Sequence, residues 1–472
     1  MSKSSPTWFE HADVPGLLES FPVDGRFLER HRSLSRDELF IRQDQAFRRC
    51  LDRAWQIPFY QRLWGAAGIE PGDITGLADL EKLPVFGKAE IMDSVERQPP
   101  LGDFHGWTPG EEGTPGDLPL IVHTTSGTTG RPQPLVFGPR SREVQNILLA
   151  RIYRMQGLVA GDVVHSVYGH GLINGGHYVR EAVTHYTHGL FLSAGTGVET
   201  RSARQVELMR DFRPSVIVGF ADYIKKLADV AREHGIEPGR DIPLRMISGH
   251  LGRESRESLS AAWGGAELFD WYGVGDTGAI AAEGPDHDGM YLMEDAQYVE
   301  VLDIDSGRPV EVGQPGDMVV TCLYKDDLYP IIRFNTHDVT EVLAGESSLG
   351  LNLRRIAGFL GRSDNMVKIR GINVFPQSLS PILESVQGFA GEFICVATRD
   401  PTGRDELAVR IEVASELVDN AGVKDAFAQA LRARLGVEVR PELCRPGSLA
   451  ELTGIEVRQK PVRLIDRRFE AP

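Results

Sequence analysis

The sequence predicts an α/β protein with two domains: a large N-terminal domain with parallel sheets and a β-rich portion, and a small α+β C-terminal domain. The chain of 472 residues is too long for one compact core. From about residue 118, short apolar runs alternate with helical stretches, which is typical of parallel strands with crossover helices. A smaller unit begins near residue 363, so we expect domains over residues 1–362 and 363–472.

Amphipathic segments and apolar runs mark the elements of the large domain in order. Phe47, Cys50, Leu51 and Ala54 recur with helical spacing, which predicts a helix over residues 37–56. Further along the chain, short apolar runs predict strands. Longer amphipathic segments predict helices between the last of these strands. The strands are expected at residues 120–122, 163–167, 215–219 and 246–248, and the helices at 202–211 and 222–234.

A β-rich portion and the C-terminal domain follow. Turn residues separate the strands of the β-rich portion, and a βαβ-type pattern comes after it. The β-rich portion is expected to have strands at residues 298–304, 318–323 and 331–334. The small domain is expected to have helices at residues 377–386 and 423–431, and strands at 393–398, 407–413 and 437–443.

The composition argues against two classes of partner. The formal net charge is -16, from 67 acidic and 51 basic residues, and such a surface repels phosphate backbones and anionic lipid. We therefore expect no nucleic-acid partner and no membrane association. No apolar run is long enough to span a bilayer, and the N-terminus lacks a signal-peptide core. The four cysteines form no CxxC pair, which favours reduced thiols and a cytoplasmic location.

A loop rich in glycine, serine and threonine follows the strand predicted at residues 120–122. Its glycines allow a backbone that points successive N–H groups at an anion, and its hydroxyl groups and arginine add donors. The residues expected to bind a polyphosphate are Thr125, Ser126, Gly127, Thr128, Thr129, Gly130 and Arg131. The loop is not a Walker A motif, because no Gly-Lys-Ser/Thr follows at the required spacing. An ordinary polar turn is the alternative.

The string TSGTTGRP in this loop closely resembles the signature of the adenylate-forming superfamily of acyl-CoA ligases, peptide-synthetase adenylation domains and luciferases. Gln133 follows it where most such loops have lysine, a departure that phenylacetate–CoA ligases share. Residues 52–60 and 80–84 resemble the helical cap of phenylacetate–CoA ligases, so a cap is expected over about residues 1–90. The resemblance implies that residues 1–362 are the adenylation domain and that the small domain is mobile.

Two further segments match the superfamily in order. Residues 269–276, FDWYGVGD, resemble the YGxTE motif, which implies that Tyr272 stacks on adenine and that Asp276 supports Mg²⁺. A metal site built from oxygen atoms accepts aspartate as well as glutamate. The segment RFNTHD, ending at Asp338, resembles RxRTxD, which assigns that carboxylate to the ribose hydroxyls.

The strongest resemblance lies at the domain boundary. Residues 361–376, GRSDNMVKIRGINVFP, closely resemble a block specific to the phenylacetate–CoA ligase branch. This implies that Arg362 contacts the nucleotide, Asp364 is the hinge between the domains and Gly371 lines the approach of the CoA thiol. The string RQKPVRLIDRR near the C-terminus resembles the ending of the family and makes Lys460 the catalytic lysine. Its ammonium group would bridge the attacking carboxylate and the α-phosphate.

The acid-binding pocket is less clearly marked. The family shapes it with segments that correspond here to residues 165–178 and to the surroundings of residues 220 and 250. The expected lining residues are Tyr168, His170, Phe220 and His250. Five of the 13 histidines lie between residues 165 and 188, which favours either a polar pocket for an amino- or hydroxy-substituted aromatic acid or a bound metal. No tight ligand spacing supports the metal.

The resemblance implies an AMP-forming aryl-acid–CoA ligase that uses ATP, Mg²⁺ and CoA. Its expected partner is a small-molecule acid, and its expected assembly is a homodimer. Departures at Gln459, Asp276 and His250 leave open a different acceptor, such as an amine or a carrier-protein thiol, or a non-carboxylate oxyacid as the activated group. A non-catalytic relative that binds nucleotide is the second alternative, against which the retained Lys460, Asp338 and Arg362 argue.

Overall fold

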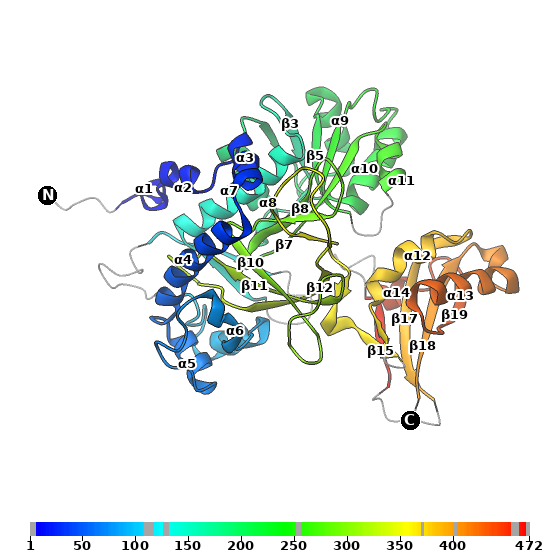
Figure 1. The fold of residues 1–472 in the computed structure, drawn as a ribbon. Coiled ribbons are helices and arrows are strands. Elements are labelled where there is room, and N and C mark those ends of the chain that lie inside the picture. Colours follow the sequence, from blue (N-terminus) through cyan, green and yellow to red (C-terminus); the bar gives the residue numbers. More distant parts are fainter. Residues whose placement is uncertain are drawn as a thin grey trace. The chain divides into compact units, whose positions relative to one another are not determined.

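The computed structural model describes residues 6–107, 118–125, 132–251, 256–369, 372–400, 404–454 and 462–468 (Figure 1). The chain divides into two compact units. The first comprises Met1–Thr336 and Glu341–Gly358, and the second comprises His337–Thr340 and Phe359–Pro472. None of the helices in the described ranges combines the length and the apolar character needed to cross a bilayer.

The first unit opens with a series of helices. The predicted helix at residues 37–56 is confirmed as α4, whose apolar face is buried. Its start is fixed by a capping box, in which Ser35 Oγ accepts from the Glu38 N–H at 3.2 Å and the Glu38 carboxylate accepts from the Ser35 N–H at 2.9 Å. The helices are α1 (Trp8–Ala12), α2 (Val14–Ser20), α3 (Gly25–Ser33), α4 (Arg36–Ala54), α5 (Pro58–Ala66), the 3₁₀ helix η1 (Leu77–Lys82) and α6 (Lys88–Arg97).

An eight-stranded sheet forms the centre of this unit. The strand order is β13-β9-β8-β7-β6-β5-β3-β4, in which β7, β6, β5, β3 and β4 run parallel and β8, β9 and β13 extend the sheet antiparallel. The strands are β3 (Val163–Ser166), β4 (Leu190–Ser193), β5 (Val216–Phe220), β6 (Met246–His250), β7 (Glu267–Val274), β8 (Gly278–Glu283), β9 (Met290–Leu292) and β13 (Arg355–Ile356). The predicted parallel α/β arrangement is confirmed.

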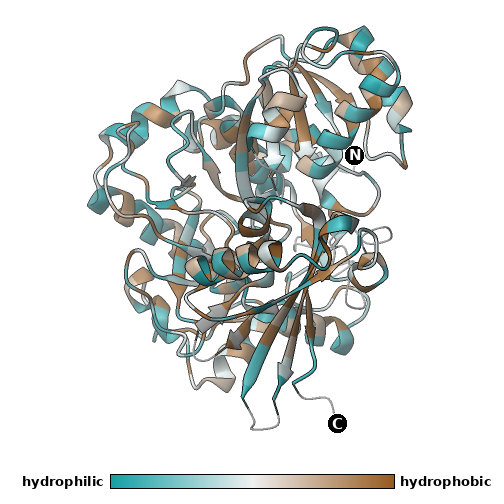
Figure 2. Ribbon diagram, turned by 90° about the vertical axis from the view of Figure 1, so that its right-hand side faces the viewer, coloured by the Kyte–Doolittle hydropathy of each residue, from teal (hydrophilic) through white to brown (hydrophobic). Residues whose placement is uncertain are grey.

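Helices cover both faces of the parallel strands because successive side chains of a strand point to opposite faces. Val216 and Val218 of β5 belong to the core that includes α7 and α8, whereas Ile217 belongs to the core that includes α9, α10 and α11. In Figure 2 the strands are mostly brown, while the helices carry both teal and brown along their length. The helices are α7 (Pro139–Met155), α8 (Asn174–Tyr186), α9 (Ser202–Phe212), α10 (Ala221–Glu233) and α11 (Arg256–Ala262).

Two antiparallel pairs complete the first unit, and one predicted strand there is wrong. Strand β1 (Ile121–Thr124) pairs with β2 (Pro134–Phe137), and β10 (Gln297–Leu302) pairs with β11 (Pro315–Cys322). The strand predicted at residues 331–334 is instead β12 (Phe334–Glu341), which only begins there. The apolar residues Ile331 and Ile332 lie outside the strand, and Arg333, directly before β12, has a left-handed φ of 60°.

The second unit is a small α+β domain. Its sheet has the order β19-β18-β17-β20, with β18 and β17 antiparallel and the outer strands parallel to their neighbours. The helix α13 connects the parallel strands β18 and β19, which makes the predicted βαβ unit. Its elements include β14 (Gly361–Arg362), β15 (Val367–Ile369), β16 (Ile372–Val374), β17 (Phe389–Arg399), β18 (Asp405–Val413), α13 (Ala421–Leu435), β19 (Arg440–Cys444), α14 (Ala450–Thr453) and β20 (Leu464–Asp466).

Two predictions in this unit are corrected. The helix predicted at residues 377–386 is split into a 3₁₀ helix η4 (Pro376–Leu379) and α12 (Ser380–Glu384), since Pro381 lacks an N–H and fits only the first turn of a helix. The strand predicted at residues 437–443 begins at Arg440, because Gly436 ends α13 with a left-handed cap and the chain needs the next residues to reach the sheet.

Candidate functional site

The predicted site residues of the first unit gather at one edge of the parallel sheet. Tyr168 lies just beyond β3, Phe220 ends β5, His250 ends β6 and Tyr272 lies near the end of β7, which is followed by Asp276. Because β3, β5, β6 and β7 are parallel neighbours, their carboxyl ends meet at the same edge. Open α/β sheets bind ligands at this edge.

An aromatic cluster occupies part of this edge. The ring centroids of Tyr168 and Phe220 are 5.3 Å apart, those of Phe220 and His250 5.4 Å, and those of His250 and Trp271 4.7 Å. Aromatic pairs favour such spacings. The structure therefore brings together three of the four predicted pocket residues and adds Trp271, which we did not predict. Its place beside Tyr272 in β7 was the signal that could have found it.

The fourth predicted pocket residue, His170, lies in a different environment. Its Nε2 is 2.7 Å from Ser193 Oγ, its ring lies 5.2 Å from that of His177, and its backbone N–H donates to the Glu199 carboxylate at 3.0 Å. The aromatic cluster as defined above does not include it.

The histidine-rich segment shows no metal site in the described residues. His165 is buried against Gln205, with its Nε2 3.0 Å from Gln205 Oε1, and burial lowers the pKa of His165 to about 4. His177 Nε2 is 2.9 Å from the Gly171 carbonyl oxygen, and His185 Nδ1 is 3.1 Å from a Glu143 oxygen. Across the described ranges, no group of three or more His, Cys, Asp or Glu side chains could hold an ion.

The base of the predicted phosphate loop is closed by Thr125 and Gln133. The Thr125 N–H donates to the Gln133 carbonyl oxygen at 3.0 Å, and the Gln133 N–H donates to Thr125 Oγ1 at 3.2 Å. Both residues adjoin the β1–β2 hairpin. The predicted loop residues Ser126, Gly127, Thr128, Thr129, Gly130 and Arg131 lie outside the described residues.

Gln133 connects the loop base to Asp276. Its Nε2 donates to Asp276 Oδ1 at 2.6 Å, and the Tyr329 hydroxyl donates to the same oxygen at 2.7 Å. Asp276 is only 5% exposed, and burial raises its pKa, while the Tyr329 hydrogen bond, the charge of Lys325 and the Gln133 hydrogen bond oppose that shift. The carboxylate therefore lies in a polar setting inside a buried region.

Asp276 can serve as a metal ligand. Among the described residues, the side-chain donors Gln133 and Tyr329 both reach Oδ1, which leaves Oδ2 without a side-chain donor there. Mg²⁺ is commonly held in proteins by one or two carboxylates together with phosphate oxygens of the substrate, so a single aspartate fits this ion.

A buried lysine lies close to this carboxylate. Lys325 is 1% exposed, and its ammonium nitrogen lies 4.3 Å from the centroid of the Tyr329 ring and 5.8 Å from that of Phe137. Burial lowers the pKa of Lys325, and the charges of Cys322 and Asp276 oppose that shift. Sequence reasoning missed Gln133, Tyr329 and Lys325 as parts of the site. A lysine at the end of the apolar run that continues from β11 through Leu323 and Tyr324 was the available signal for Lys325.

The second unit holds a separate group of predicted residues. Strand β12 pairs Asp338 with Arg362 of β14, and an Arg362 Nη donates to Asp338 Oδ1 at 2.9 Å. The same guanidinium group donates to both carboxylate oxygens of Asp364, at 2.8 and 2.5 Å. Bidentate pairs of this kind fix orientation as well as charge. Arg362 thus joins the residue predicted to bind ribose to the predicted hinge. Gly371 and Lys460 lie outside the described residues.

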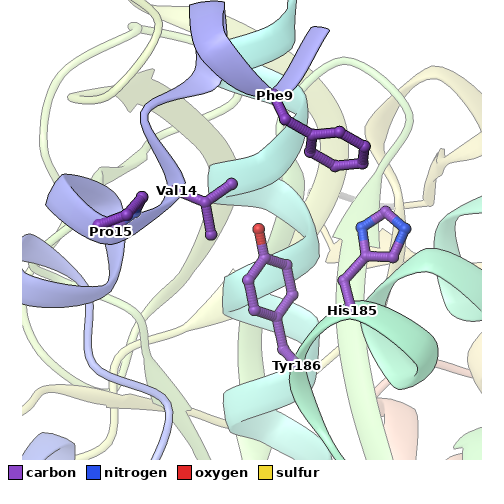
Figure 3. Close-up of a pocket in the computed structure, with 5 residues that line it drawn as sticks. All are labelled: Phe9, Val14, Pro15, His185 and Tyr186. Carbon is purple, nitrogen blue, oxygen red and sulfur yellow. The ribbon is translucent and has the colours of Figure 1, made fainter.

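A shallow pocket elsewhere in the first unit contains none of the predicted residues. It is lined by Phe9, Val14, Pro15, His185 and Tyr186 (Figure 3). Glu143 accepts hydrogen bonds there from Trp8 Nε1 at 3.0 Å and from the Tyr186 hydroxyl at 2.7 Å, and pairs with His185. The pocket lies where helices α1, α2 and α8 meet.

Known proteins resemble this chain over most of its length. The profile described as AMP-binding enzyme matches residues 72–321, and that described as AMP-binding enzyme C-terminal domain matches residues 371–468. A phenylacetate-coenzyme A ligase of Aromatoleum evansii is 29% identical over 93% of this chain and 97% of its own length. One of Pseudomonas putida is 33% identical over 76% of this chain and 78% of its own.

A solved structure of a CoA ligase also resembles this chain over most of its length. Crystalline 2-hydroxyisobutyryl-CoA ligase, in the postadenylation state with R3-HIB-AMP, superposes with a TM-score of 0.76 at 27% identity. The match covers 93% of this chain and 91% of that one. The comparison thus extends over both units of the chain.

Proposed function

This chain belongs to the family of AMP-binding enzymes, in the phenylacetate–CoA ligase-like branch, and on that premise we propose that it joins a small aromatic carboxylic acid to CoA with ATP. The class of the activity, an AMP-forming acid–CoA ligase, follows from the relatives. The nature of the acid, the use of Mg²⁺, a cytoplasmic location and a homodimer remain proposals.

The observation that supports an aromatic acid is the aromatic cluster at the sheet edge. Phe220, His250 and Trp271 lie on the neighbouring strands β5, β6 and β7, and Tyr168 lies just beyond β3. Asp276 follows β7 and accepts a hydrogen bond from Gln133 at the base of the loop. An acid that stacks on this cluster has its carboxylate on the side of the sheet edge where we propose that ATP binds. Apolar and aromatic linings with few polar groups are typical of small-molecule sites.

The first half-reaction is adenylation. A carboxylate oxygen of the acid attacks the α-phosphorus of ATP, the bond to the bridging oxygen of the β-phosphate breaks, and pyrophosphate leaves with that electron pair. We propose that Thr125 and the loop residues to Arg131 bind the phosphates, Tyr272 stacks on adenine and Lys460 neutralises the charge between carboxylate and α-phosphate. Reactions of this type depend on positioning and on charge stabilisation.

Asp276 would hold Mg²⁺ in this step through its Oδ2. When bound, the ion neutralises charge on the phosphate oxygens of ATP. Asp276, Gln133 and Thr125 form one chain of contacts, so the base of the phosphate loop and the acidic ligand lie next to each other before substrate arrives. Such preorganisation avoids rearrangement during the reaction.

The second half-reaction forms the thioester. The CoA sulfur attacks the acyl carbon, the acyl–oxygen bond breaks, and AMP leaves. We propose that Asp338 and Arg362 bind the nucleotide, that Asp364 is the hinge of a small-domain rotation, and that Gly371 lines the path of the thiol. The Arg362–Asp364 ion pair supports a structural role for this acid, because a hinge needs a defined resting geometry.

An acid panel tests the proposed substrate class. We expect pyrophosphate release with benzoic and arylacetic acids, including amino- and hydroxy-substituted ones, and AMP formation that rises when CoA is added. Short aliphatic acids should react at least ~10-fold less efficiently, since they leave the aromatic cluster without a partner. Equal efficiency for aliphatic and aromatic acids would refute the aromatic assignment while leaving the ligase activity intact.

A further inference from the structure

The two hydrogen bonds that Asp276 receives both end on the same oxygen. Gln133 Nε2 and the Tyr329 hydroxyl donate to Oδ1 at 2.6 and 2.7 Å, from segments nearly two hundred residues apart. No side-chain donor among the described residues bonds to Oδ2. Two hydrogen bonds to one carboxylate oxygen fix the plane of the carboxylate group, so its second oxygen points in a defined direction.

Tyr329 is itself held firmly in place. Its φ of 51° puts a bulky residue in the left-handed region, which persists only where the surroundings fix it. Its N–H donates to the His105 carbonyl oxygen at 3.2 Å, and its ring packs edge-on against Phe104 at 4.6 Å. The Tyr60 hydroxyl donates to the carbonyl oxygen of the next residue, Pro330.

The Lys325 ammonium group adds a charge to this arrangement. It lies 4.3 Å from the centroid of the Tyr329 ring, within the range of a cation–π contact. A buried ammonium group is costly unless it meets compensating groups, and the ring of Tyr329 and the carboxylate of Asp276 are such groups. The lysine therefore stabilises the ring whose hydroxyl bonds to Asp276.

Gln133 is fixed from the other side. Its backbone N–H and carbonyl oxygen both bond to Thr125, so its side chain extends from the closed base of the loop. The position of Asp276 is thereby tied to the position of the loop. This explains in physical terms what a glutamine contributes at the position where most related loops carry lysine.

We propose that Gln133 and Tyr329 are positioning residues that hold Asp276 by Oδ1 and so present Oδ2 to the Mg²⁺ that accompanies ATP, with Lys325 supporting the Tyr329 ring. Mg²⁺ requires nearly ideal octahedral geometry, so the direction of a carboxylate ligand affects its affinity strongly. The inference rests on the proposed function, since it requires ATP as the substrate.

The test compares Tyr329→Phe with Tyr60→Phe. Each variant removes one buried hydroxyl in the same region, but only Tyr329 donates to Asp276. Two quantities are measured: the Mg²⁺ concentration for half-maximal acid-dependent ATP–pyrophosphate exchange, and the affinity for ATP by calorimetry without acid, in Mg²⁺ and in EDTA. For Tyr329→Phe we expect a half-maximal Mg²⁺ concentration raised roughly 10-fold or more and a reduced gain in ATP affinity from Mg²⁺. ATP affinity in EDTA should stay at the wild-type value.

The control variant distinguishes a loss of Asp276 positioning from a general loss of protein stability. Tyr60→Phe should keep the wild-type Mg²⁺ dependence even if its melting temperature falls. Should Tyr329→Phe fail to fold, Gln133→Met carries the same expectation, because it keeps the volume and removes only the donor to Asp276.

Three results would overturn the proposal. They are a Mg²⁺ dependence of Tyr329→Phe equal to that of Tyr60→Phe, an unchanged dependence in Gln133→Met, and wild-type ATP binding that is no tighter with Mg²⁺ than with EDTA. A different result would refute the proposed function: wild-type protein that binds Mg²⁺ and ATP together but shows no pyrophosphate exchange with any of the acids tested. The calorimetric comparison would then still decide the role of Tyr329.

Discussion

At the scale of single residues, the members of the aromatic cluster differ in how far their side chains are exposed. Trp271 is 6% exposed and Tyr168 is 4% exposed, so their rings also contribute to the core. Phe220 is 48% exposed although it ends a strand whose other residues are buried. Single exposed aromatic rings are common on protein surfaces, so the proposed contact of Phe220 with the acid rests on its place in the aromatic cluster.

Phe220→Ala should weaken the binding of an aromatic acid without disturbing the fold. We expect the KM for the acid to rise roughly 3- to 10-fold, because an aromatic pair contributes about 0.5–1.5 kcal/mol. The KM for ATP and the melting temperature should stay near the wild-type values. Steady-state kinetics on Phe220→Ala and on Phe212→Ala, a control residue that is also about half exposed (49%), check this. An equal effect of both changes on the KM for the acid would argue against the pocket.

At the scale of elements, the short helix α1 depends on one buried carboxylate. Glu143 of α7 accepts from Trp8 at the start of α1 and from Tyr186 at the end of α8, and it pairs with His185. Burial acts to raise the pKa of Glu143, but the bonds from His185, Tyr186 and Trp8 outweigh it and hold the pKa at about 2. The packing of α1 on α7 and α8 is therefore linked to the charge of this residue.

Glu143→Gln should lower the stability of the first unit in a pH-dependent way. A depressed pKa stabilises the folded state above the ordinary value of 4.5, and the stabilisation is lost as the pH falls toward about 2. At pH 7 the loss should be roughly 3 kcal/mol, an order-of-magnitude value from the size of the shift. Thermal melts should show a gap between wild type and variant that narrows as the pH falls below ~4.5. A gap independent of pH would exclude this role.

At the scale of the whole molecule, patterns within one segment were predictable and contacts between distant segments were not. Short apolar runs predicted β3, β5 and β6, and helical spacing of apolar residues predicted α4, because both signals lie within one segment of the sequence. The start of β12 was missed, since the left-handed backbone at Arg333 is not visible in an apolar run.

The same distinction applies to the site. The resemblance assigned Asp276 a role. The strand order then explains why Tyr168, Phe220 and His250 lie at one edge of the sheet, since parallel neighbours end at the same edge. The contacts of Gln133 and Tyr329 with Asp276 could not be predicted, because they depend on how separate segments pack. The roles of Lys460, Gly371 and Ser126 to Arg131 remain predictions, as these residues lie outside the described ranges.

The most direct test of acid adenylation is the exchange of labelled pyrophosphate into ATP without CoA. We expect wild type to catalyse exchange only when an aromatic acid is present, and Lys460→Ala to reduce it at least ~100-fold, as for the loss of a group that stabilises transition-state charge. Lys424→Ala, an exposed lysine of α13, should exchange like wild type. Exchange by Lys460→Ala at the same rate as by Lys424→Ala would refute the catalytic role of Lys460. The absence of exchange by wild type with every acid tested would refute acid adenylation.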